Sequence, residues 1–152
     1  MDSALAWDGN WAWSLPLIVV TVILHVIGLA FINERLVQAK RIAAKGFDSI
    51  LVFALVMGIT TLLVTLLHAG EAAIWAAMYW ILGGLPDGKS ALLYSLGAMT
   101  TYGHQPLYLA DHWHLMGALE ALNGMILFGL TTAFLFSMIR EVWPAKSSAA
   151  VV

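Results

Sequence analysis

Apolar residues form three long runs along this chain, and polar segments separate them. The first run covers residues 15–32, where the only uncharged polar or ionisable side chains are Thr21 and His25. The second run extends over residues 50–82, and the third over residues 115–139. As a helix, each run is long enough to cross the ~30 Å hydrocarbon core of a bilayer. The pattern predicts three membrane-spanning helices.

The second run is interrupted by His68-Ala-Gly-Glu71, so its length alone allows one long helix or two shorter spans. The distribution of basic residues favours one helix. Residues 33–45 hold four of the seven Lys and Arg side chains, so the positive-inside rule predicts a cytoplasmic loop there. Three spans then place the amino terminus outside and the basic tail after residue 140 inside, whereas a fourth span would place that tail outside.

The composition also indicates an integral membrane protein. The 152 residues are 61% hydrophobic and 11% charged, and the mean hydropathy is +0.86, which is too apolar for an ordinary soluble domain. Trp7, Trp11 and Trp13 precede the first run, as expected of an interfacial aromatic belt. The first residues lack the basic region of a cleaved signal peptide. With no cysteine and a net charge of −2, the chain gives no reason to expect disulfides, thiolate metal sites or a nucleic-acid partner.

A turn and a short helix are predicted between the second and third runs. Residues 83–88 are rich in Gly and Pro, which indicates a turn. Apolar residues then recur at helical spacing over residues 88–100. Asp87 or Ser90 is suited to cap this helix.

The short helix is followed by a segment that cannot continue it. Gly103 permits a positive φ, and Pro106 cannot extend a helix. Irregular backbone at membrane depth is tolerated only where protein or a water-filled path satisfies its polar groups. We therefore predict a re-entrant pore helix over residues 88–100 and a filter loop over residues 101–105.

Five residues of this region stand out: Tyr94, Ser95, Thr100, Thr101 and Gly103. They resemble the pore helix and filter entrance of the potassium-channel superfamily, whose filter usually reads T-T-V-G-Y-G-D. The resemblance implies that four chains surround an axis and that each donates a filter strand whose carbonyls replace the hydration shell of an ion. It places a pore module at residues 47–140, with an inner helix at 112–140. Residues 1–46 are then a peripheral span with its basic loop, and residues 141–152 are a cytoplasmic tail.

The predicted filter departs from the family pattern at four positions. Tyr102 stands where the family has valine, His104 where it has tyrosine, Gln105 where it has the second glycine, and Pro106 where it has aspartate. A non-glycine residue at positive φ carries a strain of ~1–3 kcal/mol. We therefore expect cation conduction with weak discrimination between potassium and sodium. An imidazole at position 104 would make conduction depend on pH near 6–7.

Residues 117–136 resemble the inner, pore-lining helix of small prokaryotic ion-channel proteins. Glu120 and Asn123 are three residues apart and share one helix face. Glu120 is interpreted in two ways: as a brace that hydrogen-bonds to the pore helix from behind, or as a negative charge whose field concentrates cations. Asn123 either faces the cavity below the filter or makes an inter-helix hydrogen bond. Gly124 and Gly129 are candidates for a hinge or for close helix packing.

Five histidines and a carboxylate offer further chemistry. His25 and His68 lie in or near apolar helices, where two spans can hold a haem between them. His68 and Glu71 share a helix face and are expected to bind each other or the back of the pore helix, in support of the filter. His112 and His114 alternate along the chain and would point to different sides of a helix, which is a poor chelate. We expect no resident metal.

These features lead to a channel rather than an enzyme, because the chain has no catalytic triad, phosphate-binding loop or paired carboxylates. We expect an all-α homotetrameric cation channel in a prokaryotic plasma membrane. Its ligands would be permeant cations such as K⁺ or Na⁺, and its other partners would be membrane lipids, with no further cofactor. Two alternatives stay open: a structural or regulatory membrane protein that keeps the channel fold without conducting, and a small membrane haem or metal protein.

Overall fold

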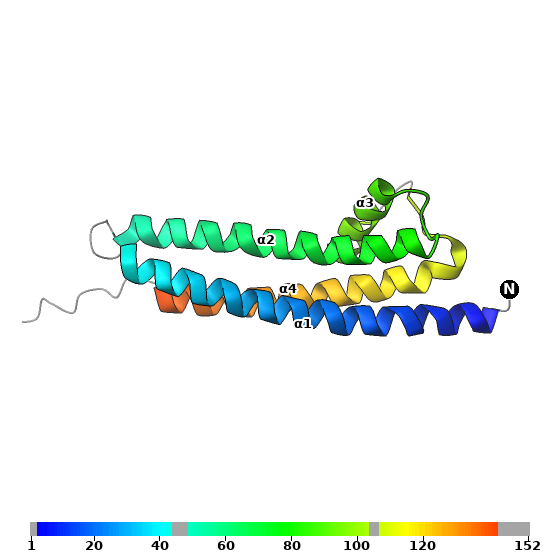
Figure 1. Cartoon of the computed structure of the whole chain (residues 1–152), viewed down its shortest axis with the longest axis horizontal. Helices are drawn as coiled ribbons and strands as arrows, with labels where there is room; N and C mark the ends of the chain where they lie inside the picture. The colour runs from blue at the N-terminus through cyan, green and yellow to red at the C-terminus, as the bar shows by residue number, and fades with distance from the viewer. Residues whose placement is uncertain (1–2, 44–48, 104–106, 143–152) are drawn as a thin grey trace, which may run out of the picture.

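The computed structural model describes residues 3–43, 49–103 and 107–142 of the chain. These residues form four α-helices and one 3₁₀ turn, and no strand occurs within them. The helices are α1 (Ser3–Ala43), α2 (Ser49–Ile81), α3 (Gly88–Met99) and α4 (His114–Val142), with the turn η1 (Asp111–Trp113) before α4. The long helices α1, α2 and α4 lie side by side, and the short helix α3 lies at the end where α2 stops and α4 begins (Figure 1).

The three long helices carry the apolar runs. The stretches Trp7–Leu36, Ile50–Ile81 and Asp111–Glu141 are long and apolar enough to cross a membrane. The second run forms one helix and is not divided at His68-Ala-Gly-Glu71, as the charge distribution predicted.

Helix α1 is longer than the sequence pattern suggested at both ends. The tryptophan-rich residues before the first apolar run are part of this helix, which begins at Ser3. Residues 33–43, expected as a loop, continue the same helix to Ala43. This stretch contains Glu, Arg, Gln, Lys and Ala, which favour helix, and no Gly or Pro. The charged residues of this stretch therefore do not end the helix.

Within its apolar run, helix α1 turns its polar side chains toward the bundle and exposes many of its large apolar side chains. Its buried residues recur every three or four positions and make one stripe: Asn10, Ser14, Leu17, Thr21, His25, Leu29, Ile32 and Leu36. Large aliphatic side chains on the opposite side, such as Ile23 and Ile27, are more than half exposed. A helix that points polar groups at its neighbours and apolar groups outward is suited to an apolar solvent. This pattern agrees with the membrane character of the sequence.

Two apolar clusters fill the bundle on either side of a polar layer. One cluster lies at the end that carries α3 and is centred on Trp75, Tyr79 and Met116. The other lies toward the α1–α2 connection and includes Ile32 and Val56. Between the two clusters, each long helix contributes buried polar residues: His25 from α1, His68 and Glu71 from α2, and Thr131 from α4.

Helix α3 is fixed at its start by a side-chain cap. Asp87 is the cap residue, and its Oδ1 accepts hydrogen bonds of 2.9 Å from the backbone N–H groups of Lys89 and Ser90. The Ser90 hydroxyl donates to Asp87 Oδ2 at 2.8 Å. Hydrogen bonding from Ser90 holds the pKa of the Asp87 carboxyl below its usual value. Helix α3 packs against α2 and α4 and makes no contact with α1 among the described residues, so it lies on the bundle face away from α1.

Candidate functional site

The candidate filter segment begins where α3 ends. Thr100 caps the helix with φ −86° and ψ 0°, and its hydroxyl donates to the carbonyl of Leu96 at 2.7 Å. Thr101 follows with φ +57° and Gly103 with φ +77°. Positive φ is ordinary for glycine, but it is an outlier for a β-branched residue and costs ~1–3 kcal/mol. Backbone strain of this kind is concentrated at functional segments, and here it falls on Thr101, one of the residues of the predicted filter loop.

Residues 100–103 are exposed on the side of the bundle where α3 packs against α4. Tyr102 is 88% exposed, the highest value among the exposed large apolar and aromatic side chains of the described chain. A hollow of about 340 Å³ opens beside it and is lined by residues of α3, the following segment and α4, among them Tyr94, Gly97, Thr101, Tyr108 and Ala118. His104 and Gln105, the other predicted filter residues, lie outside the described residues.

Two glycines of α4 let α3 approach its backbone closely. A Cβ on Gly124 would overlap the backbone of Met99, the last residue of α3. A Cβ on Gly117 would overlap the Tyr94 hydroxyl, which is the far end of a movable side chain. At Gly129 a Cβ would meet no other atom within 4 Å. Of the two roles considered for Gly124, close packing is therefore the one that the geometry supports.

The Glu120 carboxyl group of α4 binds side chains of both α2 and α3. Tyr79 donates to Glu120 Oε2 at 2.6 Å, and the Ser95 hydroxyl lies 2.5 Å from Glu120 Oε1 and 2.7 Å from the carbonyl oxygen of Ala72. All three side chains are almost fully buried. These contacts connect α2, α3 and α4 at one point, which is the geometry of the brace interpretation.

The hydrogen atoms available to this group constrain its charge. A serine hydroxyl carries one hydrogen, and the Ala72 carbonyl can only accept. Both short contacts of Ser95 are complete only when Glu120 holds a proton on Oε1. A neutral Glu120 would brace α3 without placing a negative charge beside it.

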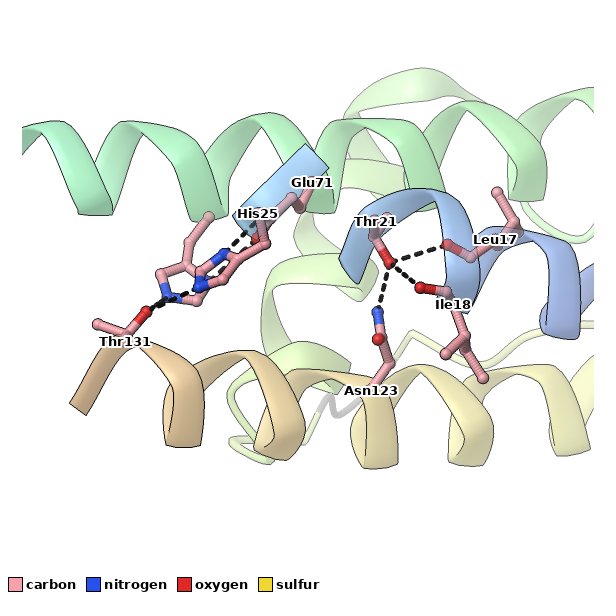
Figure 2. Close-up of polar contacts among 8 residues, drawn as sticks. Leu17, Ile18, Thr21, His25, Glu71, Asn123 and Thr131 are labelled. Atoms are coloured by element: carbon pink, nitrogen blue, oxygen red, sulfur yellow. Dashed lines mark hydrogen bonds and ion pairs between the residues drawn. The ribbon is translucent and has the colours of Figure 1, made fainter. Parts of the chain in front are cut away.

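Asn123 binds α1 and does not face an open cavity. It is fully buried, and its Nδ2 donates to Thr21 Oγ1 at 2.9 Å, while Thr21 donates to the carbonyl of Leu17 at 2.8 Å (Figure 2). Of the two roles considered for Asn123, the inter-helix hydrogen bond is the one that the structure contains. A cavity-lining role for this side chain is therefore not supported.

His68 and Glu71 contact each other, which is one of the two partners that the sequence suggested for them, and they also contact α1 and α4. His25 Nδ1 lies 2.9 Å from Glu71 Oε1, and His68 Nδ1 lies 3.3 Å from Glu71 Oε2. The Nε2 atoms of His25 and His68 lie 3.1 Å and 3.0 Å from Thr131 Oγ1. Figure 2 shows His25, Glu71 and Thr131 of this group between α1, α2 and α4. We call these four residues, His25, His68, Glu71 and Thr131, the histidine layer.

The histidine layer leaves little space for a haem. The two imidazole rings are adjacent, with centroids 5.0 Å apart and planes at 44°. A porphyrin held by both histidines would have to pass between these rings. The surface histidines also have separate partners, since His114 Nε2 is 2.9 Å from the carbonyl of Leu109 while His112 packs against Trp113.

Sequence reasoning missed the partners of these groups. Asn10, expected only as part of an interfacial segment, donates to the His112 carbonyl at 2.6 Å and accepts from the backbone N–H of Met116 at 2.8 Å, which fixes the start of α4. Tyr79, Ser95, Thr21 and Thr131 were likewise not singled out as partners. One signal was available: Asn10, Ser14, Thr21 and His25 recur at helical spacing in an apolar stretch.

The described residues form a helical protein in which three long helices fit a membrane and a fourth, short helix packs against two of them. Comparisons with protein-family models, with curated proteins and with solved structures find no match to this chain. Function must therefore be argued from its own residues.

Proposed function

We propose that the protein is a homotetrameric cation channel with a weakly selective filter, in which α3 is the re-entrant pore helix and α4 the inner helix. One observation carries the proposal: α3 ends in an exposed segment whose backbone is left-handed at Thr101 and Gly103. Ion filters made of backbone carbonyls need such handedness changes, because an extended strand directs alternate carbonyls to opposite sides.

The electrostatics of α3 favour cations over anions. The carboxyl end of a helix carries a partial negative charge from its unpaired carbonyl groups. In α3 this end is followed at once by Thr100 and Thr101, whose carbonyl and hydroxyl oxygens are additional ligands for a monovalent cation. The proposed ligands are therefore permeant ions such as K⁺ or Na⁺ at residues 100–103, and the proposed filter continues into His104 and Gln105.

The position of α3 supports a re-entrant path. Helix α2 ends and α4 begins at the same end of the bundle, and α3 lies near that end, where it packs against both (Figure 1). The chain between the second and third long helices would thus enter and leave the membrane on one side. By the positive-inside rule, we assign the amino terminus to the outside of a prokaryotic plasma membrane and the carboxyl terminus to the cytoplasm.

The exposed face of α3 and the segment after it are accessible to other copies of the chain. Leu92, Leu93 and Leu96 are between one third and one half exposed, and Tyr102 and Tyr108 are more exposed still. One pore loop cannot enclose a path, so several copies must surround an axis, and four is the number that the family resemblance implies. Helix α1, which does not contact α3, would be the outermost helix.

The filter sequence argues for weak selectivity. Gly103 is the only glycine in residues 100–106, and Tyr102 is bulky. The four-site filter of the family would need a second left-handed position near Gln105, where a side chain opposes it. We expect cations to be preferred over chloride, with potassium and sodium passing at similar rates.

Ion flux tests the proposal directly. Purified protein is reconstituted in liposomes, and the influx of K⁺, Na⁺ and Cl⁻ is compared with that of protein-free liposomes at pH 6 and pH 8. Similar K⁺ and Na⁺ flux that exceeds Cl⁻ flux supports the proposal. Strong K⁺ selectivity would refute the filter argument, and absence of flux of any ion at either pH would favour a non-conducting membrane protein that keeps this fold.

A further inference from the structure

The histidine layer contains more contacts than its hydrogens can fill. Four contacts join its members in a ring: each histidine touches Glu71 through Nδ1 and Thr131 through Nε2. Two neutral imidazoles and one hydroxyl supply three hydrogens, and a carboxylate supplies none. Three hydrogens fill at most three of the four contacts, so at least one contact lacks a hydrogen, and an additional cation, either a proton or a metal ion, would fill it.

The location of the unfilled contact favours a metal ion. His68 Nδ1 and Glu71 Oε2 are buried atoms without a hydrogen-bond partner among the described residues, although they lie 3.3 Å apart. The pair is therefore in ion-pair range but does not form a hydrogen bond, which leaves both atoms available to a shared ion. The Glu71 side chain is only 2% exposed, so water does not offer it an easy alternative partner.

We propose that His25, His68 and Glu71 form a buried binding site for a divalent transition-metal ion of the Zn²⁺ class. One ligand atom from each residue lies within 4.8 Å of the other two. Ligands about 2.0–2.2 Å from a shared Zn²⁺, at angles between square and tetrahedral, lie roughly 2.9–3.4 Å apart. The distance from His25 Nδ1 to Glu71 Oε1 is 2.9 Å, and the distance from His68 Nδ1 to the other carboxylate oxygen, Oε2, is 3.3 Å. Both distances fall in this range.

The residues around the three ligands would orient them. With both Nε2–H groups donating to Thr131, the lone pairs of both Nδ1 atoms are directed at Glu71. Outer hydrogen bonds of this kind fix the tautomer and orientation of metal-binding imidazoles. The Phe128 ring stacks on His68 with centroids 4.5 Å apart, which restricts rotation of that imidazole.

The donor set also separates this site from the proposed ion path. Imidazole nitrogen suits Zn²⁺, Cu²⁺, Fe²⁺ and Ni²⁺, whereas K⁺ and Na⁺ prefer oxygen ligands. The layer lies between α1, α2 and α4 and includes no residue of α3 (Figure 2). The bound ion would tie α1 to α2 in the middle of the bundle and would offset the cost of a buried carboxylate. The sequence alone did not predict it because its three ligands come from two helices, His25 from α1 and His68 and Glu71 from α2.

Metal content of the full-length protein tests the site. The protein is purified in detergent without a polyhistidine tag, equilibrated with micromolar Zn²⁺ and desalted, and zinc is counted per chain by mass spectrometry. We expect one Zn²⁺ per chain for the wild type and for His112→Gln, a control in an exposed histidine, and loss of the bound ion in His68→Gln and Glu71→Gln. Wild-type protein without stoichiometric zinc, or zinc that is lost in the His112→Gln control and kept in His68→Gln, would overturn the proposal.

A second measurement keeps the test decisive if the ligand variants fail to fold. Thr131→Val leaves all three ligands in place and removes only the outer hydrogen bonds, so Zn²⁺ should bind about 10- to 100-fold more weakly. In ¹⁵N-histidine-labelled wild type, Zn²⁺ should shift the Nδ1 signals of His25 and His68. Signals that do not respond to Zn²⁺ and that show one imidazolium in the layer would mean that a proton fills the contact, and would refute the metal site.

Discussion

Gly124→Ala is the substitution whose effect follows most directly from the packing of α3 on α4. An alanine Cβ at this position would lie 2.9 Å from the carbonyl carbon and the Cα of Met99 and closer still to its oxygen. These are backbone atoms, so they cannot move aside without moving the end of α3. Overpacking of this kind costs about 1–3 kcal/mol.

The net effect includes the better helix propensity of alanine. Replacing glycine inside a helix by alanine gains up to about 1 kcal/mol. Gly129→Ala, one and a half turns further along the same helix, has this gain without an overlap and is the matched control. We therefore expect Gly124→Ala to be about 1–3 kcal/mol less stable than Gly129→Ala. Gly117→Ala should lie between them, because the atoms it would meet belong to the side chains of Tyr94 and Leu109, which can be displaced at a lower cost than backbone.

Thermal unfolding in detergent at a fixed scan rate measures the difference. For a chain of this size, 1 kcal/mol corresponds to about 2–4 °C in Tm. The same proteins are tested for ion flux, where displacement of Met99 should change the conductance of Gly124→Ala and leave Gly129→Ala like the wild type. If Gly124→Ala is as stable as Gly129→Ala and conducts equally, α3 does not end against this glycine and the packing argument is wrong.

Three further predictions concern the brace, the cap and the strained threonine. Glu120→Ala should destabilise the protein by about 1–3 kcal/mol, because it leaves Tyr79 without its acceptor. Glu120→Gln should cost less, because its amide can still bind both Tyr79 and Ser95. Equal decreases in Tm for the two variants would contradict a neutral brace. The low pKa of Asp87 in the fold means that its stabilising contribution is present above pH ~4 and is lost as the pH falls through the folded-state pKa. Asp87→Asn, which keeps a capping side chain, should therefore show a smaller Tm decrease than wild type between pH 6 and pH 3. Thr101→Gly should raise Tm by relieving strain of about 1 kcal/mol or more while altering cation flux, and a lowered Tm would show that the left-handed backbone is not strained.

The helices were predictable because their signals are local. Three apolar runs and a capped short helix follow from hydropathy, helical spacing and turn residues, and the observed α3, Gly88–Met99, agrees closely with the predicted range 88–100. Residues 33–43 were misjudged because charge was read as a loop signal. In an isolated helix end, however, Lys, Arg and Glu are good helix formers, and nothing in that stretch stops the helix.

The partners of the buried polar groups were not predictable in the same way. Glu120 and Asn123 lie on one helix face, yet Glu120 binds Ser95 while Asn123 binds Thr21 of the first span. Which neighbour each side chain meets depends on how the helices pack, and one sequence does not specify that packing. The histidine layer illustrates the same limit, because His25 and Thr131 are 106 residues apart.

The account's central claim is that residues 100–103 line an ion path, and a single introduced cysteine tests it most directly. The natural chain contains no cysteine, so the thiol of Tyr102→Cys would be unique. The control is Asp8→Cys, an exposed position near the start of α1. A small cationic thiol reagent is applied to both sides of liposomes that contain either variant, and the extent of modification is verified by mass. We predict that modification of Tyr102→Cys removes most of the cation flux and that modification of Asp8→Cys leaves it unchanged. Complete modification of Tyr102→Cys with no change in flux would contradict the claim.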